Sequence, residues 1–322
     1  MMTLSYCGQD DFTCADGHCI SMDKRCNRKE DCQDSSDERD CNIIKAFEGY
    51  NKMFLPLPAE NQDKFTLNIS LTIRNIVEID EINGKFGVNI RIIQSWLNPQ
   101  FQYLNLQRHE DQNILSENDK EKMWIPYTVF ANVKNLGKIM RTHRRDFLKI
   151  TPDSKFEFKR GSRYEFMNSR IFSGSENVLK FEREFDTEWN CDFNLGWFPF
   201  DSQVCFLKFF HEEADIELKP IAVEFTGSKQ LSQHYFKAVK ICEHKIDKKQ
   251  GVVVEIHIGR PLFGSILTIF MPTIILVILS QVIQVFAMDH IEMVIGVHLT
   301  LLLVLATMYV FIGFPLTFFI FM

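Results

Sequence analysis

The chain has 322 residues and a formal net charge of −6, which suits two or three domains and argues against a nucleic-acid-binding surface. Eight of its nine cysteines fall in patterns that suggest pairs, so we expect an oxidising compartment and a secreted or cell-surface protein. The residues before Cys7 are too few for a signal peptide, so we expect the natural N-terminus to lie upstream.

The first segment, residues 6–42, is rich in cysteines and acids. Its six cysteines are Cys7, Cys14, Cys19, Cys26, Cys32 and Cys41. A segment this short cannot bury a core that holds it, so it needs disulfide or metal cross-links, and the residues alone leave many pairings open. The carboxylates of Asp31, Asp34, Asp37 and Glu38 would repel one another unless a cation joined them. Ca²⁺, which takes roughly six to eight oxygen ligands, is the natural candidate.

This segment resembles a class A repeat of the LDL receptor. The motifs that match are Phe12-Thr-Cys14, Cys19-Ile20, Asp31-Cys32 and Ser36-Asp37-Glu38. The resemblance implies the disulfides Cys7–Cys19, Cys14–Cys32 and Cys26–Cys41. It also implies a structural Ca²⁺ bound by the side chains of Asn27, Asp31, Asp37 and Glu38 and by the backbone carbonyls of Lys24 and Lys29. The alternative is an unrelated cysteine-rich fold with a solvated acidic face.

Residues 43–62 contain two prolines and are predicted to form a linker. Beyond them, apolar and polar residues alternate in several stretches, for example over 67–73, 86–92 and 252–258. This period of two indicates half-buried strands, and short strands with turn signals over 63–260 predict one immunoglobulin-like β-sandwich. Asn68 begins a glycosylation sequon, which fits an extracellular face.

The stretch Cys191–Cys205 is a loop rich in aromatic residues between two cysteines. A disulfide between them would close a loop of about 15 residues and contribute roughly 3 kcal/mol in the chain-entropy model. Trp197, Phe198 and Phe200, beside Pro199, are too apolar for a tip in water, so we expect them to dock on an apolar partner. The alternative is a cross-linked surface hairpin.

Residues 261–322 are predicted to contain membrane-spanning helices. The first, about 262–287, is apolar or weakly polar throughout, and the second covers about 292–310. Because the disulfide-bonded domains would lie outside the cell, the turn between the two helices would be cytosolic. The remainder stays apolar to the last residue, so we expect a truncated or misjoined C-terminus.

The loop Cys191–Cys205 resembles the signature of the Cys-loop, or pentameric, ligand-gated ion channels: thirteen residues separate the cysteines, and Phe198-Pro199-Phe200-Asp201 lies inside. The resemblance covers roughly 52–308. It implies a subunit of a homo- or hetero-pentamer in the plasma membrane, multi-pass, with extracellular N-terminal domains and a small extracellular ligand, and not an enzyme. The alternatives are an accessory subunit that binds no agonist and a cell-surface adhesion receptor anchored by its helices.

The same resemblance implies that a charge cluster couples the sandwich to the pore. Its members would be Glu81, Asp201 and the pre-membrane Arg260, beside Phe198, Pro199 and Phe200. A buried set of this kind contributes little net stability but specifies one arrangement. The alternative is three unrelated surface charges.

In this family an aromatic box at subunit interfaces binds an amine by cation–π attraction. The corresponding positions here are Arg91, Val129, Ala131 and Glu212, none of which is aromatic. Arg91 and Glu212 would either bind a charged ligand or pair with each other, so we expect a silent site or one that does not take an amine.

Residues 293–308 resemble the pore-lining second helix. Val294, His298, Leu301 and Leu305 form one helical stripe, in which Leu301 would be the hydrophobic gate and His298 an ionisable group inside the membrane. A register shifted by one residue would turn His298 away from the pore. Glu292 at the cytosolic mouth predicts cation selectivity, and the alternative is an ordinary helix-capping acid.

Overall fold

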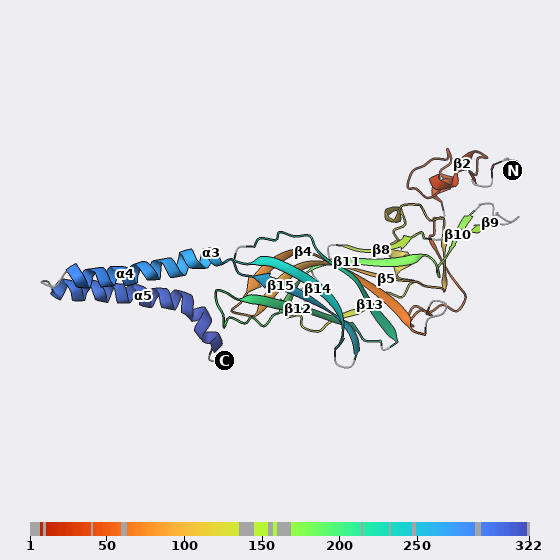
Figure 1. Cartoon of the computed structure of the whole chain (residues 1–322). Helices are drawn as coiled ribbons and strands as arrows, with labels where there is room; N and C mark the ends of the chain where they lie inside the picture. Colours follow the sequence, from red (N-terminus) through yellow and green to blue (C-terminus); the bar gives the residue numbers. More distant parts are fainter. Residues whose placement is uncertain are drawn as a thin grey trace.

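The computed structural model describes residues 7–8, 11–39, 41–58, 63–134, 145–153, 157–159, 169–213, 215–231, 233–246, 249–286 and 291–320. A small cysteine-rich module precedes a β-sandwich, and helices leave the opposite end of the sandwich (Figure 1). The order of parts along the chain is therefore also their order in space.

The N-terminal module contains little regular structure. Its elements are β1 (Asp11–Thr13), β2 (Cys19–Ser21) and the 3₁₀ turns Met22–Lys24 and Ser36–Glu38. Its buried apolar core consists of Phe12, Cys14, Met22 and Cys32. So small a core needs covalent support, and the structure forms the disulfides Cys7–Cys19, Cys14–Cys32 and Cys26–Cys41, the pairing that the resemblance implies.

Two large sheets make up the sandwich. The first, in the order β13-β4-β5-β11-β8, contains Ile216–Phe225, Phe65–Asp80, Lys85–Trp96, Val178–Asn190 and Arg145–Thr151. The second, in the order β14-β15-β12-β7, contains Tyr235–Ile246, Lys249–Gly259, Ser202–His211 and Thr128–Phe130. A small sheet, β3-β6-β10-β9, contains Ile44–Ala46, Phe101–Leu104, Ser169–Ser173 and Glu157–Lys159. Short helical segments lie at Glu110–Gln112 and at α1, Glu117–Lys120.

The core of the sandwich lies between the two large sheets. The alternate positions that carry the apolar pattern of the three stretches are at most 2 % exposed: Leu67, Ile69, Leu71, Ile73, Phe86, Val88, Ile90, Ile92, Val252, Val254, Ile256 and Ile258. Successive side chains of a strand point to opposite faces, so a period of two puts one set inside. The sandwich predicted from the alternation is confirmed.

The expected linker at 43–62 is wrong in part, because some of it is built into the sandwich. Strand β3 pairs antiparallel with β6, and Ile44 lies opposite Tyr103. The Tyr50 hydroxyl accepts a hydrogen bond from the Trp124 backbone N–H at 2.8 Å, and its ring meets Phe101 edge to face. These contacts are made with residues far along the chain, which local sequence patterns do not reveal.

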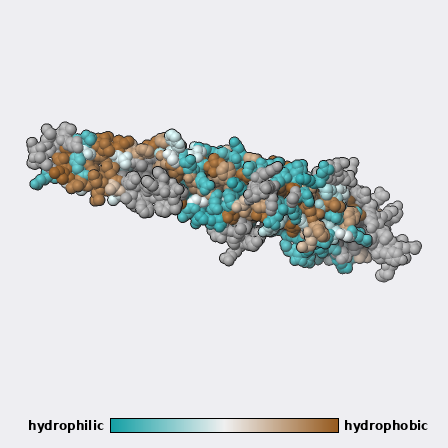
Figure 2. All heavy atoms as spheres, turned by 90° about the horizontal axis from the view of Figure 1, so that it is seen from below, coloured by the Kyte–Doolittle hydropathy of each residue, from teal (hydrophilic) through white to brown (hydrophobic). Residues whose placement is uncertain are grey.

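The helical part consists of α3 (Leu262–Ser265), a π-helical segment (Ile266–Phe270), α4 (Met271–Phe286) and α5 (Ile291–Ile320). Helices α4 and α5 lie side by side (Figure 1), and α5 extends to Ile320 rather than ending near 310. Figure 2 shows apolar side chains gathered over these helices, whereas the face of the sandwich seen in this view is mostly hydrophilic. Within the described residues, no helix combines the length and apolar character that crossing a membrane requires.

Candidate functional site

Arg260 lies at the junction between the sandwich and the helices, just after β15 and just before α3. Its side chain is 7 % exposed. Its Nε lies 3.0 Å from Asp201 Oδ1, and its Nη2 forms an ion pair with Glu81 Oε1. The guanidinium carbon also lies 4.7 Å from the centre of the Phe198 ring. The structure therefore brings together the three charges that sequence analysis named as a coupling cluster.

Asp201 is the acid held most tightly in this cluster. Its side chain is 2 % exposed, and burial alone would raise its pKa. Hydrogen bonds from Arg260 and from Gln203 Nε2, the latter at 2.6 Å, outweigh burial and hold the pKa of Asp201 below its ordinary value. Gln203 also exchanges two hydrogen bonds of 2.8 Å with the Asn194 backbone, so it fixes the loop around the acid.

A disulfide joins Cys191 to Cys205 and closes the loop that carries Asp201. The Cys191 N–H donates to the Gly84 carbonyl at 3.0 Å, which ties this loop to the β4–β5 turn that carries Glu81. Gly84 has φ +60°, and a Cβ there would lie 3.2 Å from the Cys191 carbonyl oxygen. Both the backbone angle and the close approach favour glycine at this position.

The aromatic tip of the loop lies at the helical end of the sandwich. Ser202, directly after the tip, pairs across the sheet with Gly259, three residues before α3. Trp197 is 80 % exposed and Phe200 is 67 % exposed, whereas Phe198 is half-buried under Arg260. Two large aromatic side chains are thus available for an apolar partner beside the helices.

His234 is a fourth member of the cluster that sequence reasoning missed. It is 3 % exposed, and its Nε2 lies 2.8 Å from Glu81 Oε1, the oxygen that also pairs with Arg260. The residue comes from the segment between β13 and β14, so three connections of the sandwich meet at the cluster. A lone histidine in a loop gives no sequence signal of such a role.

Within the chain, Arg91 pairs with Glu182 and not with Glu212, and a pairing of Arg91 with Glu212 across a subunit interface stays a prediction. Arg91 Nε lies 2.7 Å from Glu182 Oε1 on the neighbouring strand β11, and this contact raises the pKa of Arg91. Glu212 is exposed and follows β12 in the other sheet. Arg91 and Glu182 share one sheet, where residues on adjacent strands come into contact.

The neighbours of Arg91 form a network of opposite charges on the same sheet. Lys149 Nζ lies 3.6 Å from Glu182 and 2.7 Å from Asp111. Arg74 lies 3.1 Å from Glu184 on the same strand as Glu182. This face therefore offers compensated charges rather than an aromatic box.

The other two expected ligand positions lie on a different sheet. Val129 is half-buried on β7, opposite Phe210. Ala131 follows this strand and is exposed, with its N–H donating to the Lys208 carbonyl at 2.8 Å. One chain thus presents the four predicted positions on two separate sheets.

Next to Glu212, a buried polar group bridges the two large sheets. His211 is 4 % exposed, and its Nε2 lies 3.1 Å from Gln94 Nε2. Gln94 also donates to Thr128 Oγ1 at 2.9 Å. Burial lowers the pKa of His211 to about 4, and a hydrogen bond with the Tyr127 backbone offsets this only in part. His211 is therefore neutral at neutral pH.

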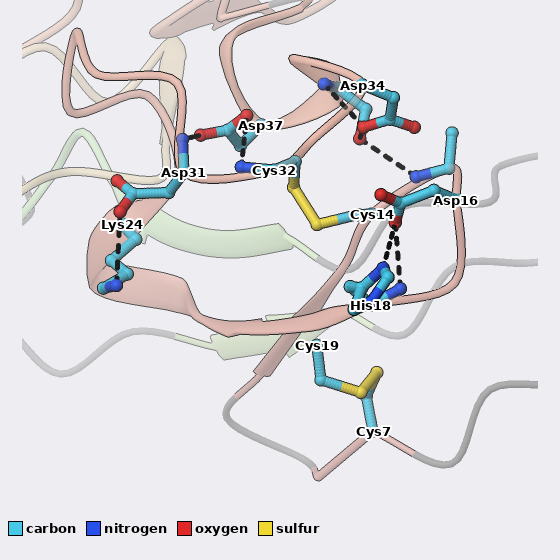
Figure 3. Close-up of a disulfide and its surroundings, with 12 residues drawn as sticks. Cys7, Cys14, Asp16, His18, Cys19, Lys24, Asp31, Cys32, Asp34 and Asp37 are labelled. Carbon is cyan, nitrogen blue, oxygen red and sulfur yellow. Dashed lines mark hydrogen bonds and ion pairs between the residues drawn. A yellow bond between two sulfur atoms is a disulfide. The ribbon is translucent and has the colours of Figure 1, made fainter.

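Hydrogen bonds link the predicted calcium ligands of the N-terminal module, and Figure 3 shows three of their residues, Lys24, Asp31 and Asp37. Asn27 Nδ2 donates to Asp31 Oδ2 at 2.8 Å, and the Asp31 N–H donates to Asp37 Oδ2 at the same distance. Glu38 Oε1 accepts from the Arg28 N–H at 2.9 Å. The donor set is one amide and three carboxylates, all hard oxygens, which fits the chemistry of Ca²⁺.

A positive charge already lies against this set, because Lys24 Nζ is 3.2 Å from Asp31 Oδ1. Among the described His, Cys, Asp and Glu side chains, the grouping whose ligand atoms all lie within 4.8 Å of one another is Cys14, Cys32 and Asp34. Both of its sulfurs are in a disulfide, so this grouping is not a metal site.

The predicted pore stripe lies toward α4 in this chain. Val294, His298, Leu301 and Leu305 are all half-buried, and His298 Nε2 lies 3.1 Å from Ser280 Oγ on α4. Glu292 is exposed in the first turn of α5. Asn68, the predicted glycosylation site, is half-buried near the start of β4, and its modification stays a prediction.

Two protein-family models match the chain. Residues 42–255 match the neurotransmitter-gated ion-channel ligand binding domain. Residues 5–41 match the low-density lipoprotein receptor domain class A. The boundary between the two matches agrees with the step from the cysteine-rich module to the sandwich.

Several curated proteins are similar to the chain. The acetylcholine receptor subunit beta-type unc-29 of Caenorhabditis elegans is 20 % identical over 77 % of this chain and 45 % of its own length. The glutamate-gated chloride channel subunit beta of Haemonchus contortus is 25 % identical over 54 % of this chain and 37 % of its own. The gamma-aminobutyric acid receptor subunit beta-like of Drosophila melanogaster is 22 % identical over 80 % of this chain and 51 % of its own. The chain spans about half or less of the length of these relatives.

Proposed function

Because the chain belongs to the neurotransmitter-gated ion-channel family and carries a class A repeat, we propose that it is a subunit of an ion channel opened by an extracellular ligand. The observation that carries this proposal is the position of Arg260 between the sandwich and α3, bound to Asp201 of the Cys191–Cys205 loop and to Glu81 of the β4–β5 turn. Ion channels of this family are not enzymes, so we propose no enzymatic activity for the chain.

The coupling follows from how Arg260 is held. Its backbone continues β15 into α3, while its side chain is clamped by acids from two other connections. A ligand that shifts the sheet of β15 and β12 relative to the β4–β5 turn must therefore move the start of α3 or break a buried ion pair. Breaking such a pair is costly, so the motion passes to the helix.

The exposed tip of the Cys191–Cys205 loop gives a second route to the helical region. Trp197 and Phe200 present apolar surface at the helical end of the sandwich, where a membrane helix would receive them. This contact would move with the loop, because the disulfide and Gln203 fix the tip to the strand that carries Asp201. Arg260 and the tip would thus transmit one motion through two contacts.

We place the sandwich and the class A repeat outside the cell, with α3 to α5 in the plasma membrane as part of a multi-pass region. The apolar side chains that α4 and α5 expose support this placement, for instance Ile274, Ile278, Leu302 and Leu303. The relatives are channel subunits, so we propose a homo- or hetero-pentamer with related subunits. This proposal includes the predicted pore residues, Glu292, Val294, His298, Leu301 and Leu305. In the assembled pentamer, the helical stripe that lies toward α4 in this chain would face the pore axis instead.

The agonist of this chain would not be bound by an aromatic box. Arg91 is neutralised by Glu182, and Val129 and Ala131 offer no ring for a cation. The network around Glu182 and Lys149 presents hydrogen-bonding charges of both signs. A polar or zwitterionic ligand suits that surface better than a simple amine.

The class A repeat would hold a structural Ca²⁺ through Asn27, Asp31, Asp37 and Glu38, with carbonyls from Lys24 and Lys29. The ion would supply the cross-link that the four buried apolar residues of the module cannot. Asn27 brings no charge to the set, so we expect a weaker site than one with a fourth carboxylate.

Expression in oocytes tests the proposed function. The chain, alone and together with related subunits, would be challenged with acetylcholine, glutamate and γ-aminobutyric acid at matched surface expression. Evoked current from the chain alone supports an agonist-gated subunit. Current only in mixtures, unchanged by Arg91→Ala and Glu212→Ala, supports the accessory alternative. Surface expression without current in any combination contradicts the channel assignment.

A further inference from the structure

The class A repeat contacts the sandwich through the beginning of its predicted calcium loop. Arg25 lies between Lys24 and Asn27, two predicted ligands, and its carbonyl accepts a hydrogen bond from Gln107 Nε2 at 2.7 Å. The Arg25 side chain is buried, and its guanidinium lies 4.5 Å from the centre of the Phe12 ring in the core of the repeat. One residue is thus held by the repeat on one side and by the sandwich on the other.

Gln107 is itself fixed to the sandwich core. Its N–H donates to Asn113 Oδ1 at 2.7 Å, and Asn113 Nδ2 donates back to the Gln107 carbonyl at 2.8 Å. The same amide reaches the carbonyl of Ile150, a fully buried residue of β8, at 3.2 Å. A continuous series of hydrogen bonds therefore runs from the Arg25 carbonyl to a core strand.

An ion pair makes a second connection. Asp23 Oδ1, next to the predicted ligand Lys24, lies 2.6 Å from Arg170 Nη1 on β10. The Arg170 side chain is 14 % exposed. The Arg170 backbone exchanges two hydrogen bonds with Asn105, so the guanidinium is presented from a fixed position.

A cleft of about 420 Å³ lies between the two parts, with walls from both. The repeat contributes Arg28 and Glu38, and the sandwich contributes Gln107, Asn113 and Ser116. Glu38 is a predicted calcium ligand, so one end of the predicted loop borders the sandwich. The sandwich thus contacts the repeat beside the first of the predicted ligands and shares a cleft with the last.

We propose that calcium binding by the repeat and docking of the repeat on the sandwich are thermodynamically coupled, with Gln107 and Arg170 as the sandwich residues that raise calcium affinity. This inference rests on the calcium assignment made above. Docking restricts residues 23–25 and so removes part of the ordering cost of the loop before the ion binds. Linkage then requires that the ion stabilise the docked sandwich by the same factor.

Calorimetric titration of Ca²⁺ into the full chain in detergent micelles tests the first half of the coupling. Gln107→Leu, Asp23→Arg and Arg170→Asp should each weaken calcium affinity by roughly 5-fold or more, at the low end of typical coupling. The double variant D23R/R170D restores the ion pair in reverse and should recover most of the affinity. Arg74→Asp, which breaks an ion pair remote from the repeat, is the matched control and should leave affinity unchanged.

Tryptophan emission tests the second half, because all four tryptophans, Trp96, Trp124, Trp189 and Trp197, belong to the sandwich. Ca²⁺ should raise the thermal midpoint of the emission change in the wild type and raise it by clearly less in Gln107→Leu. Calcium binding with an insensitive midpoint and unchanged variant affinities would overturn the coupling alone. If the wild type bound no Ca²⁺, both the calcium assignment and the coupling would fall.

Discussion

The guanidinium of Arg260 lies over the ring of Phe198, 4.7 Å from the ring centre, in the same position that pairs it with Asp201. The ring and the carboxylate belong to one loop, which a disulfide closes. This loop therefore binds the guanidinium in two ways, by a cation–π contact with the ring and by an ion pair with the carboxylate. The residue that leads into α3 is consequently fixed to the loop rather than merely near it.

Replacing Arg260 with Gln should lower the free energy of unfolding by about 3–5 kcal/mol, because it leaves the buried Asp201 carboxylate without its cation. Urea titration of the full chain, followed by tryptophan emission, measures the change. Lys219→Gln removes an exposed ion pair with Glu217 and should cost less than about 1 kcal/mol. Equal effects of the two substitutions would contradict the buried cluster.

The double variant Cys191→Ala/Cys205→Ala should lower the free energy of unfolding by about 3 kcal/mol, because it releases a loop of about 15 residues in the unfolded chain. Changing both residues avoids a stray thiol. Cys242→Ala is the control: Cys242 is exposed and forms no disulfide in the part of the chain that the structure describes. A double variant as stable as this control would speak against the disulfide.

His234→Leu should cost about 1.5–3 kcal/mol of stability, because the hydrogen bond that it removes involves a charged acceptor, Glu81. In a Glu81→Leu background the same change should cost clearly less, since the partner is already gone. A double-mutant cycle by urea titration measures the difference. His257→Leu, which affects a more exposed pair with Glu255, is the comparison. If the effects of His234→Leu and Glu81→Leu on stability were strictly additive, the two side chains would not interact and His234 would not belong to the cluster.

Acid should destabilise the sandwich through His211. Its pKa is lowered to about 4 in the folded chain, so between pH 6.5 and about 4 the unfolded chain binds the proton and the folded chain does not. The stability that neutral His211 contributes is complete above about pH 6.5 and declines by about 3 kcal/mol as pH falls to about 4. Between pH 7.5 and 4, the free energy of unfolding of His211→Gln should therefore fall by about 3 kcal/mol less than that of the wild type. Equal acid sensitivity in both proteins would show that His211 is not the titrating group.

Sequence patterns predicted the parts of the fold whose physical cause is local. The alternation from Leu67 to Ile73 reflects a strand with one buried face, and that face is buried. The spacing of Cys191 and Cys205 reflects a loop that a disulfide closes. Each signal lies within one short segment, so no knowledge of strand pairing was needed.

What sequence reasoning missed depends on contacts between distant segments. Arg91 meets Glu182 because β5 and β11 pair in one register, and neither residue indicates that register by itself. Strand β3 has three residues, too few for an alternation to be visible. His234 joins Glu81 from a loop more than a hundred residues away along the chain. Such pairings follow from the topology, which the one-dimensional pattern does not contain.

The central claim is that the contact between Asp201 and Arg260 transmits the ligand signal to the helices. The most direct measurement is the current evoked in oocytes by whichever of acetylcholine, glutamate or γ-aminobutyric acid activates the wild type, recorded for Asp201→Arg, Arg260→Asp and the D201R/R260D double variant at equal surface expression. We predict that each single variant reaches the surface with little or no evoked current and that the double variant recovers a substantial part of it. Normal currents in both single variants would contradict the account.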